Sequence, residues 1–346
     1  MKQLQRYEVC ESSQIKEGQI FSYTVKDGDN SEYELLIIRY QGKLYCVGGI
    51  DTYDGKTSLK NGICFENKLY SPQNGSAFNI QTGLPELAPA IDELPRFYVE
   101  EVIQINKKND NIIKIKKKQG KVIIYIPKYI PKRIVPAFQT KYASDFRKVV
   151  IIGSGPAAFG AIESLRLTGY TGEITLITKG TKLPYDKTKL TKSFKNLNYK
   201  NLYLRDEDWY ESTGINFMLG REVVYVDKTH GSPYVLLEDG LKIEYDGLIV
   251  ATGVSPEIRE IEGLQEKENV SFLYNMEHHK KIKYYLESAK HITILGNSIR
   301  TMECASTIKK EFPHIDIWVV DENKKPVMGQ EYGEELYDQI LKYQNQ

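Results

Sequence analysis

The sequence predicts a chain of several domains, in which an all-β region comes before two α/β nucleotide-binding units, the second of them partial. Short β-rich runs divided by turn residues fill roughly the first hundred positions. A β-branched run, a glycine-rich turn and a helical pattern follow one another at residues 148–167, and a weaker copy begins at residue 291. The length of 346 residues is enough for two or three domains.

Composition excludes several classes of protein. The net charge is +1 with 27% charged residues, so we expect no specific nucleic-acid partner. No apolar run approaches the ~18 residues of a membrane helix, so no transmembrane segment is expected. The cysteines Cys10, Cys46, Cys64 and Cys304 form no C-x-x-C pair, which favours a reducing compartment. The N-terminus has no apolar leader. The sequence leaves two localisations open, a mitochondrial assembly or a cytoplasmic one, which includes a ciliary assembly.

The first domain is expected to be all-β and to span residues 1–120. The candidate strands cover residues 20–25, 33–40, 43–47, 68–70 and 97–105, followed by a hairpin that turns at residues 109–111. Residues 121–147 contain several prolines, which cannot donate to a sheet ladder, so a basic extended linker is expected there. The lysine run around it is either a solvated face or a basic surface for an acidic partner.

Two runs in this region, DTYDG and SPQNG, resemble the ligand loops of a Rieske domain, C-x-H-x-G and C-P-x-H-G. Asp51, Tyr53, Ser71 and Asn74 stand at the four ligand positions. A Rieske cluster needs two thiolates and two imidazoles, and every histidine of the chain lies beyond residue 229. We therefore expect a degenerate Rieske-like domain with no 2Fe–2S cluster and no other metal. Hydrogen bonds from Asp51, Ser71 and Asn74 are expected to replace the metal in part.

The strongest motif is the glycine-rich turn that follows the β-branched run. Gly153, Gly155 and Ala158 give the G-x-G-x-x-A form of the dinucleotide fingerprint. The first glycine permits a tight turn, the second lets the backbone approach a pyrophosphate, and the alanine lets the helix pack on the sheet. The first amide groups of a helix over residues 157–168 would face the anion. This predicts a Rossmann-like dinucleotide-binding domain at residues 148–262, against the alternative of an ordinary βα turn.

Residues 173–178 predict the second strand of the same sheet. Most dinucleotide sites place an acidic residue at the end of this strand to hold a ribose hydroxyl. Thr178 and Lys179 occupy that place here, which predicts a weakened adenosine end.

The next motifs resemble those of the apoptosis-inducing-factor-like flavoproteins, in particular the subgroup with a Rieske domain before a pyridine-nucleotide oxidoreductase body. The run LPYDKTKLTK stands where that family has L-P-Y-D-R-P-x-L-S-K, so Lys187 replaces an arginine and Lys192 matches the lysine beside the flavin. The run ATGVSP matches the A-T-G-x-x-P turn of the FAD domain. The resemblance implies that FAD is a possible cofactor, with the following binding residues: Gly153, Gly155, Pro156, Ala157, Ala158, Lys187, Lys192, Ala251, Thr252, Gly253 and Glu303.

A second fingerprint is degenerate. The run GNSIRTME stands where the family has G-x-G-x-x-G-x-E, and Ser298 and Thr301 replace the second and third glycines. Side chains there would keep a pyrophosphate away from the backbone, so NAD(P) binding is expected to be weak or absent. Glu303 matches the family glutamate, so the resemblance implies a Lys192–Glu303 pair, and Asp321 matches the acidic residue for a ribose.

Residues 263–346 are therefore expected to form a partial NAD-binding-like domain. The resemblance implies that a full member would continue by roughly as much again, so this sequence is divergent and truncated at its C-terminal end. The sheets would then expose open edges and apolar faces. Other protein subunits could cover them, a separate polypeptide could supply the rest, or the sequence is incomplete.

Two functions fit these patterns. The first is a catalytically degenerate relative, a pseudoenzyme without catalytic residues that serves as a structural subunit of a larger assembly. The alternative is an FAD-dependent NAD(P)H oxidoreductase of the apoptosis-inducing-factor-like family. No thiol pair follows the first fingerprint helix, which excludes disulfide reductase chemistry under either hypothesis.

Overall fold

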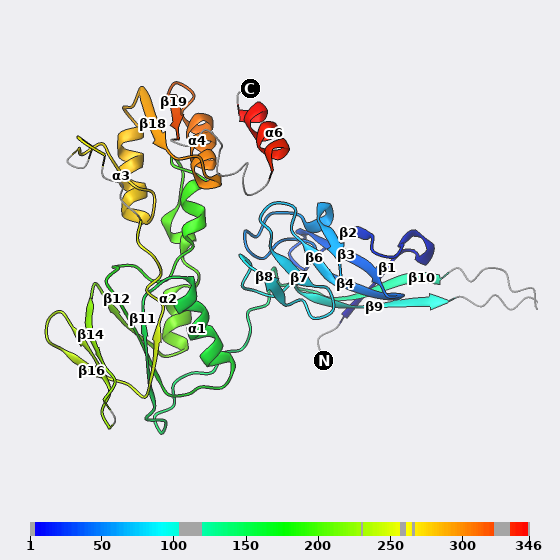
Figure 1. The fold of residues 1–346 in the computed structure, drawn as a ribbon. Helices are drawn as coiled ribbons and strands as arrows, with labels where there is room; N and C mark the ends of the chain where they lie inside the picture. The colour runs from blue at the N-terminus through cyan, green and yellow to red at the C-terminus, as the bar shows by residue number, and fades with distance from the viewer. Residues whose placement is uncertain are drawn as a thin grey trace, which may run out of the picture. The chain divides into compact units, whose positions relative to one another are not determined.

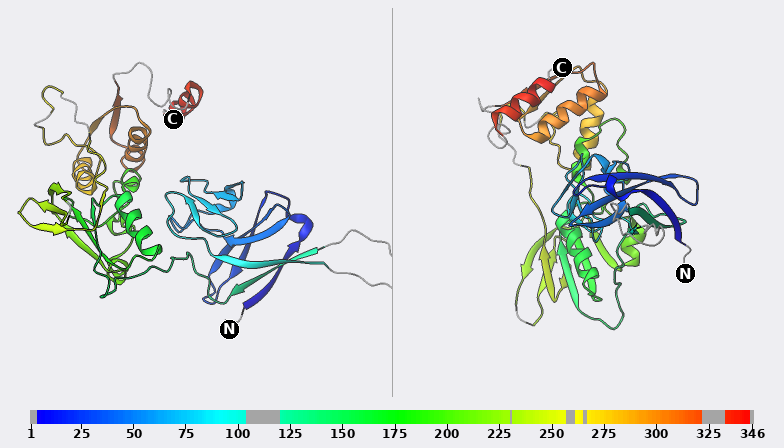
Figure 2. Two further views of the ribbon diagram at one scale, coloured as in Figure 1. Left: turned by 60° about the horizontal axis from the view of Figure 1, so that its bottom comes forward. Right: turned by 90° about the vertical axis from the view of Figure 1, so that its right-hand side faces the viewer.

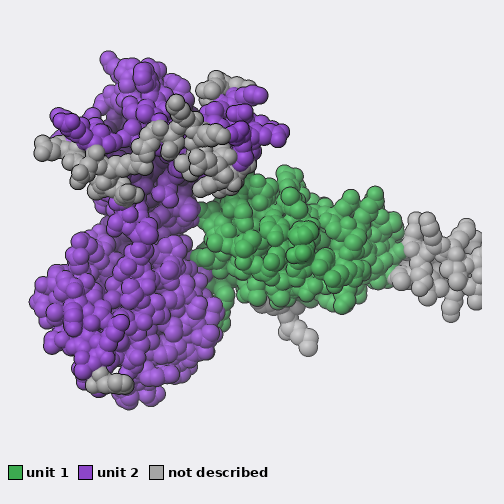
Figure 3. All heavy atoms as spheres, in the orientation of Figure 1, with its two compact units in different colours: residues 1–137 green, residues 138–346 purple. Residues whose placement is uncertain are grey.

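The computed structural model divides the chain into two units, residues 1–137 and 138–346, and Figure 1 shows the elements of both. Figure 3 colours the two units separately, and we describe each by itself. The structure describes residues 4–103, 120–229, 231–256, 261–264, 267–321 and 333–344. The turn predicted at residues 109–111 lies outside these ranges.

Unit 1 consists of two antiparallel sheets. The six-stranded sheet has the order β1-β10-β9-β4-β3-β2 and the four-stranded sheet the order β5-β6-β7-β8. The strands of the first are β1 (Leu4–Glu11), β2 (Ile20–Lys26), β3 (Glu32–Tyr40), β4 (Lys43–Gly48), β9 (Arg96–Ile103) and β10 (Gly120–Pro127). Those of the second are β5 (Ile63–Phe65), β6 (Lys68–Tyr70), β7 (Ala77–Asn79) and β8 (Pro85–Leu87), and the short 3-10 helices are η1 (Ser12–Gln14) and η2 (Leu59–Asn61).

Strand β3 separates two apolar cores. Its successive side chains point to opposite faces, so Leu35 and Ile37 enter one core while Leu36 and Ile38 enter the other. The second core continues into the four-stranded sheet through Leu69 and its neighbours. This double burial explains why β3 is apolar over four consecutive residues.

The structure differs from the linker predicted at residues 121–147. Strand β10 pairs with β1 on one side and β9 on the other. Its alternating residues Val122, Ile124 and Ile126 are buried, and Pro127 ends the strand, where its missing N–H group disrupts no further ladder. Beyond it, the backbone of Ile134 exchanges two hydrogen bonds of 3.0 Å with Glu93, so the chain stays in unit 1 as far as that residue.

Unit 2 begins with a parallel sheet of order β13-β12-β11-β17. Its strands are β11 (Lys148–Ile152), β12 (Glu173–Thr178), β13 (Ile215–Leu219) and β17 (Gly247–Val250), and its helices are α1 (Pro156–Leu167) and α2 (Glu207–Ser212). An antiparallel sheet of β14 (Val223–Asp227), β15 (Tyr234–Leu237) and β16 (Lys242–Glu244) packs on one face through Val150, Ile177, Val235 and Leu237. Helix α1 lies against the parallel sheet on the side away from this antiparallel sheet (Figure 1).

The second half of unit 2 is a smaller α/β layer. It contains α3 (Met276–Leu286), β18 (His291–Leu295), α4 (Ile299–Glu311), β19 (Asp316–Val320) and α6 (Glu334–Gln344). Helix α4 lies beside β18 and β19 (Figure 1 and the left view of Figure 2), which are parallel neighbours. A segment of the first half, with η3 (Lys187–Thr191) and η4 (Tyr199–Leu202), reaches this layer and buries Phe194 between α3 and α4.

A buried arginine joins α1 to the loops that surround it. The Arg166 side chain is fully buried and donates hydrogen bonds of 2.8–3.0 Å to four backbone carbonyl oxygens, those of Tyr170, Gly172, Thr213 and Gly214. Burial lowers the pKa of the guanidinium. The carbonyl groups replace the water that the charge has lost, so the side chain connects two loops that are far apart in the sequence.

We expect Arg166→Met to lower the free energy of unfolding of unit 2 by about 3 kcal/mol, because four buried carbonyl groups lose their donors. Arg221→Met, which removes an exposed arginine, should change it by less than about 1 kcal/mol. Both tryptophans of the chain, Trp209 and Trp318, lie in unit 2, so denaturant titrations followed by tryptophan fluorescence measure its stability. Equal losses in the two variants would contradict this assignment.

Candidate dinucleotide-binding site

Two of the predicted motifs meet where parallel strands end. Residues 153–158 follow β11, and residues 251–253 follow its neighbour β17. The backbone N–H of Gly153 donates to Ile177 O at 2.8 Å, and that of Ala251 donates to Ile152 O at 2.8 Å. We call the residues that follow β11, β12 and β17 the carboxyl edge of the sheet, which is where open α/β sheets bind ligands.

Gly153 is required by both its backbone conformation and its neighbours. Its φ of +117° is unfavourable for any residue with a side chain. A β-carbon at this position would stand less than 3.0 Å from the carbonyl of Ala251 and block the approach of the turn after β17. The first fingerprint glycine therefore brings the two motif-bearing turns together.

Gly155 leaves an open helix terminus. It is the N-cap of α1 with an ordinary φ of −86°, and a β-carbon added there would meet no atom within 4 Å. No side chain caps this helix, and Pro156 at its first position has no N–H group to satisfy. Ala157 is exposed and Ala158 is buried against the sheet. The remaining amide groups of the first turn are therefore free to bind an anion, and the residues present fit a pyrophosphate.

The two glycines make a matched pair for a stability test. Gly153→Ala should lower the free energy of unfolding by more than about 3 kcal/mol, because the added methyl group overlaps a backbone carbonyl. Gly155→Ala should cost about 1 kcal/mol or less, because its methyl group enters open space. Denaturant unfolding of the two variants measures the difference, and a Gly153→Ala protein as stable as Gly155→Ala would contradict the close approach.

The end of β12 is built without an acidic residue. The Thr178 hydroxyl lies 3.1 Å from the Ser154 hydroxyl and accepts the N–H of Gly180 at 3.1 Å. Lys179 pairs with Glu222 at 2.8 Å. Because the Thr178 hydroxyl already has two protein partners, it joins the fingerprint turn to the sheet, and we predict that it contributes little to holding a ribose.

Lys192 and Glu303 meet in the structure. The ammonium group of Lys192, at the end of η3, pairs with the carboxylate of Glu303 on α4, which also accepts the hydroxyl of Thr191. The Lys192 side chain is 57% exposed, so the pair by itself adds little stability. The pair nevertheless brings the LPYDKTKLTK run together with the second fingerprint, as the resemblance implied.

A second carboxylate on α4, Glu311, holds the segment that follows Lys192. It accepts the Ser193 hydroxyl at 2.6 Å and the backbone N–H groups of Phe194 and Lys195 at 2.7 and 2.8 Å. Burial would raise the pKa of this carboxyl, but the three hydrogen bonds outweigh it and leave the pKa below its ordinary value. Sequence reasoning did not identify Glu311, because its partners lie 116–118 residues away.

His279 on α3 holds the same segment from the other side. Its buried ring stacks on Phe194, donates from Nε2 to Ser193 O at 2.9 Å and accepts the Tyr199 hydroxyl at Nδ1 at 2.8 Å. Both ring nitrogens are therefore used by the neutral imidazole. Burial lowers the pKa of His279 from its ordinary value of 6.5, so the folded chain resists protonation of this ring.

This burial predicts a pH-dependent contribution to stability. Below pH 6.5 the unfolded chain binds a proton at His279, whereas the folded chain binds it only at lower pH. The free energy of unfolding should therefore fall by up to about 1.4 kcal/mol for each unit by which the pH is lowered. His279→Gln should reduce the measured slope, to which His278 also contributes because burial lowers its pKa, whereas replacing the exposed His314 by Gln should keep it. Urea titrations between about pH 7.5 and 5.5 measure the slopes. A wild-type slope that persists unchanged in His279→Gln would contradict the assignment.

Lys187, where the family has arginine, contacts an aromatic ring. Its ammonium group lies 3.8 Å from the ring centroid of Tyr274, a cation–π contact. The hydroxyl of Tyr274 in turn donates to the backbone carbonyl of Val254, just after Gly253. Nothing in the motifs pointed to Tyr274.

The second fingerprint has a closed helix terminus. Gly296 keeps a positive φ of +97°, but the Ser298 side chain caps α4 by accepting the N–H of Thr301 at 3.3 Å. The two hydroxyl groups lie 3.1 Å apart. Protein groups thus use part of the first turn that an anion would need, in contrast to α1.

In unit 1 the loops at the predicted ligand positions are joined by a side-chain hydrogen bond. The buried carboxylate of Asp51 accepts the Tyr53 N–H at 2.9 Å and the amide of Asn74 at 2.9 Å. Asn74 also accepts the N–H of Ser76 at 2.9 Å. The prediction is wrong for Ser71, whose hydroxyl is buried without a hydrogen-bond partner among the described residues. Among those residues no three His, Cys, Asp or Glu side chains are grouped for metal binding.

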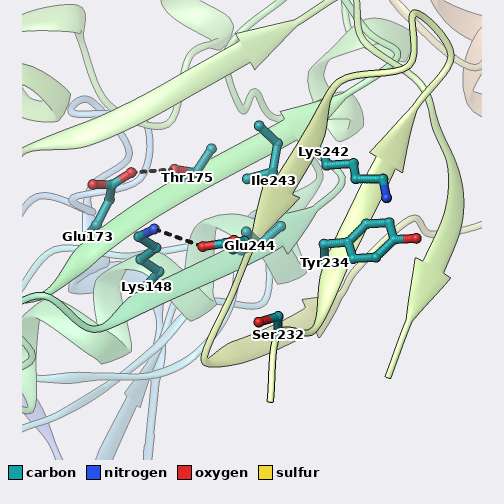
Figure 4. A pocket seen from close by; sticks show the side chains of 9 residues that line it. Lys148, Glu173, Thr175, Ser232, Tyr234, Lys242, Ile243 and Glu244 are labelled. Atoms are coloured by element: carbon teal, nitrogen blue, oxygen red, sulfur yellow. Dashed lines mark hydrogen bonds and ion pairs between the residues drawn. The ribbon is translucent and has the colours of Figure 1, made fainter. Parts of the chain in front are cut away.

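A hollow of about 520 Å³ lies away from the carboxyl edge. Its lining includes Lys148 and Glu173, the first residues of β11 and β12, and Lys242 and Glu244 of β16 (Figure 4). Figure 4 shows Lys148 directed at Glu244, which pair at 3.6 Å. The hollow lies at the amino ends of the strands and is not part of the candidate dinucleotide site. No helix in the described ranges has the length and apolar character to cross a membrane.

The parallel sheet and the open terminus of α1 are typical of dinucleotide-binding α/β folds, and comparisons with known proteins specify the family. Residues 147–345, more than half of the chain, match the family described as pyridine nucleotide-disulphide oxidoreductase. The chain belongs to this family. An all-β N-terminal region precedes the family's Rossmann-like fold.

The chain is similar to apoptosis-inducing factor 3 of Homo sapiens, with 26% identity over 95% of this chain and 51% of that protein. This confirms the predicted resemblance to apoptosis-inducing-factor-like proteins, and the chain spans about half the length of these relatives. The chain is also similar to the ferredoxin–NAD(+) reductase component of the p-cumate 2,3-dioxygenase system of Pseudomonas putida. The identity is 32% over 48% of this chain and 40% of that protein.

A solved ferredoxin reductase from Rhodopseudomonas palustris matches with a TM-score of 0.50 and 25% identity, over 56% of this chain and 48% of its own. The last two proteins are named as reductases, and their names give no support to the expectation that NAD(P) binding is weak or absent.

Proposed function

We propose that this chain is a catalytically degenerate member of its family, a pseudoenzyme that serves as a structural subunit of a larger assembly. The observation that carries the proposal is the hydrogen bond between Asn74 and Asp51. In this proposal unit 1 is a Rieske-like domain, and the bond holds together two loops that iron would otherwise join. The residues at the ligand positions do not fit a 2Fe–2S cluster, because none offers a thiolate or an imidazole.

The second fingerprint, residues 296–303, supports the same proposal. Within unit 2 we assign residues 148–262 to an FAD-binding-like domain and residues 263–346 to a partial NAD-binding-like domain. Ser298 and Thr301 place side chains where the family has glycine, and Ser298 caps α4 itself. An NAD(P) pyrophosphate would have to replace this cap, which disfavours its binding.

Exposed apolar side chains support a role in an assembly. On β17 and β19, each at the edge of its described sheet, Val250 is 63% and Trp318 is 68% exposed. Val254, just after the carboxyl end of β17, is 76% exposed. Apolar side chains at sheet edges are typical of surfaces that other chains cover, so we propose protein subunits as the partners.

A second candidate function is an FAD-dependent NAD(P)H oxidoreductase, favoured by the open terminus of α1 and the Lys192–Glu303 pair. When bound, FAD accepts a hydride from a nicotinamide. Residues 153–158 would hold its pyrophosphate, residues 251–253 would line the adjacent turn, and Lys187 and Lys192 would lie on the flavin side with Glu303. Retention of these groups is also compatible with a flavin-holding module that does not turn over.

Iron content tests the first candidate. The chain, expressed with an active iron–sulfur assembly system and purified without oxygen, should contain iron and acid-labile sulfide far below stoichiometric amounts and lack the visible absorption of a cluster. A variant with Asp51→Cys, Tyr53→His, Ser71→Cys and Asn74→His should acquire about two irons per chain, because it restores the ligand set. Asp51→Cys with Ser71→Cys alone is the matched control and should stay below this value. About two irons in the unmodified chain would contradict the proposal.

A further inference from the structure

Tyr274 connects two segments of the carboxyl edge that are distant in the sequence. On one side its ring lies 3.8 Å from the ammonium group of Lys187, in the segment that follows β12. On the other side its hydroxyl donates to the carbonyl of Val254, in the turn that follows β17. The Tyr274 side chain thus connects the segment that follows β12 with the turn that follows β17.

The backbone next to Tyr274 is held firmly. Asn275 caps α3 by accepting the N–H of His278 at 2.8 Å, and the N–H of Met276 donates to the Tyr185 hydroxyl at 3.2 Å. Met276 is buried in a core that Tyr185 shares. Since the residues immediately after Tyr274 are fixed, the position of its ring is decided mainly by rotation of its own side chain.

We propose that Tyr274 is a gate at the carboxyl edge, which a flavin dinucleotide has to displace before its ring reaches the neighbourhood of Lys192. A ligand whose pyrophosphate lies on the open terminus of α1 extends along the ends of the strands, where Tyr274 joins Lys187 to Val254. This inference rests on the part of the proposed function that assigns FAD to this edge.

The gate lowers the affinity for FAD because binding breaks two contacts. Displacement of Tyr274 ends a cation–π contact with Lys187 and a hydrogen bond to a backbone carbonyl. Removing the side chain should therefore tighten binding, whereas a tyrosine that served as a flavin contact would give the opposite result. The sign of the change distinguishes the two roles.

The experiment is a titration of the flavin-free full chain with FAD, followed by the quenching of FAD fluorescence. Tyr274→Ala should bind FAD at least about tenfold more tightly than the wild type, because both contacts are gone. Tyr274→Phe, which keeps the ring and loses only the hydroxyl, should lie between them. Tyr284→Ala removes a tyrosine that is 71% exposed on α3 and should leave the affinity unchanged.

Lysine acylation read by mass spectrometry supplies a second measurement that needs no FAD. Tyr274→Ala should raise the labelling rate of Lys187 severalfold, because the ring no longer covers its ammonium group, and Tyr284→Ala should not. Thermal unfolding of each variant shows whether it is folded. Unchanged labelling of Lys187 in folded Tyr274→Ala would overturn the contact on which the gate depends.

Equal or weaker binding of FAD by folded Tyr274→Ala overturns the gate, as does the absence of FAD binding in both chains. Neither result changes the proposal of a structural subunit without an iron–sulfur cluster. Conversely, iron in the unmodified chain would contradict that proposal and leave tighter binding by Tyr274→Ala as evidence for the gate. The two proposals therefore fail on different results.

Discussion

The close approach of two backbone turns, made possible by the missing side chain of Gly153, is the constraint on which the site depends. The turn after β17 reaches the fingerprint only because residue 153 has no β-carbon to collide with Ala251. Two residues further on, Gly155 is the N-cap of α1, whose first turn is left without a side-chain cap. A change in this one contact would separate the motifs that the parallel sheet brings together.

Elsewhere the protein holds its shape through contacts between its own side chains. Glu303 and Glu311, on one helix, hold Lys192 and the residues after it, while His279 holds the same segment from α3. In unit 1 the bond between Asp51 and Asn74 joins two loops in the same way. Side-chain contacts thus fix segments that are far apart in the sequence, and under the proposed function the bond between Asp51 and Asn74 joins loops that a metal would otherwise join.

Local sequence patterns predicted several of the elements but not the long-range contacts. The fingerprint predicted β11 and α1 closely, because strand, turn and helix are encoded within twenty residues. Strand β10 was predicted as part of a linker, because Pro127 and the prolines that follow it outweighed the alternation that places Ile124 in the core. Tyr274 and Glu311 could not be found from the sequence, since their roles depend on partners far away in the chain.

Oxidation of NADH by the purified chain supplied with FAD tests the central claim most directly, with ferricyanide as the electron acceptor. The account predicts no turnover above that of free FAD at any NADH concentration, because α4 caps its own terminus with Ser298. Turnover that saturates with NADH and is lost in Gly155→Arg, which places a bulky side chain at the open terminus of α1, would contradict it.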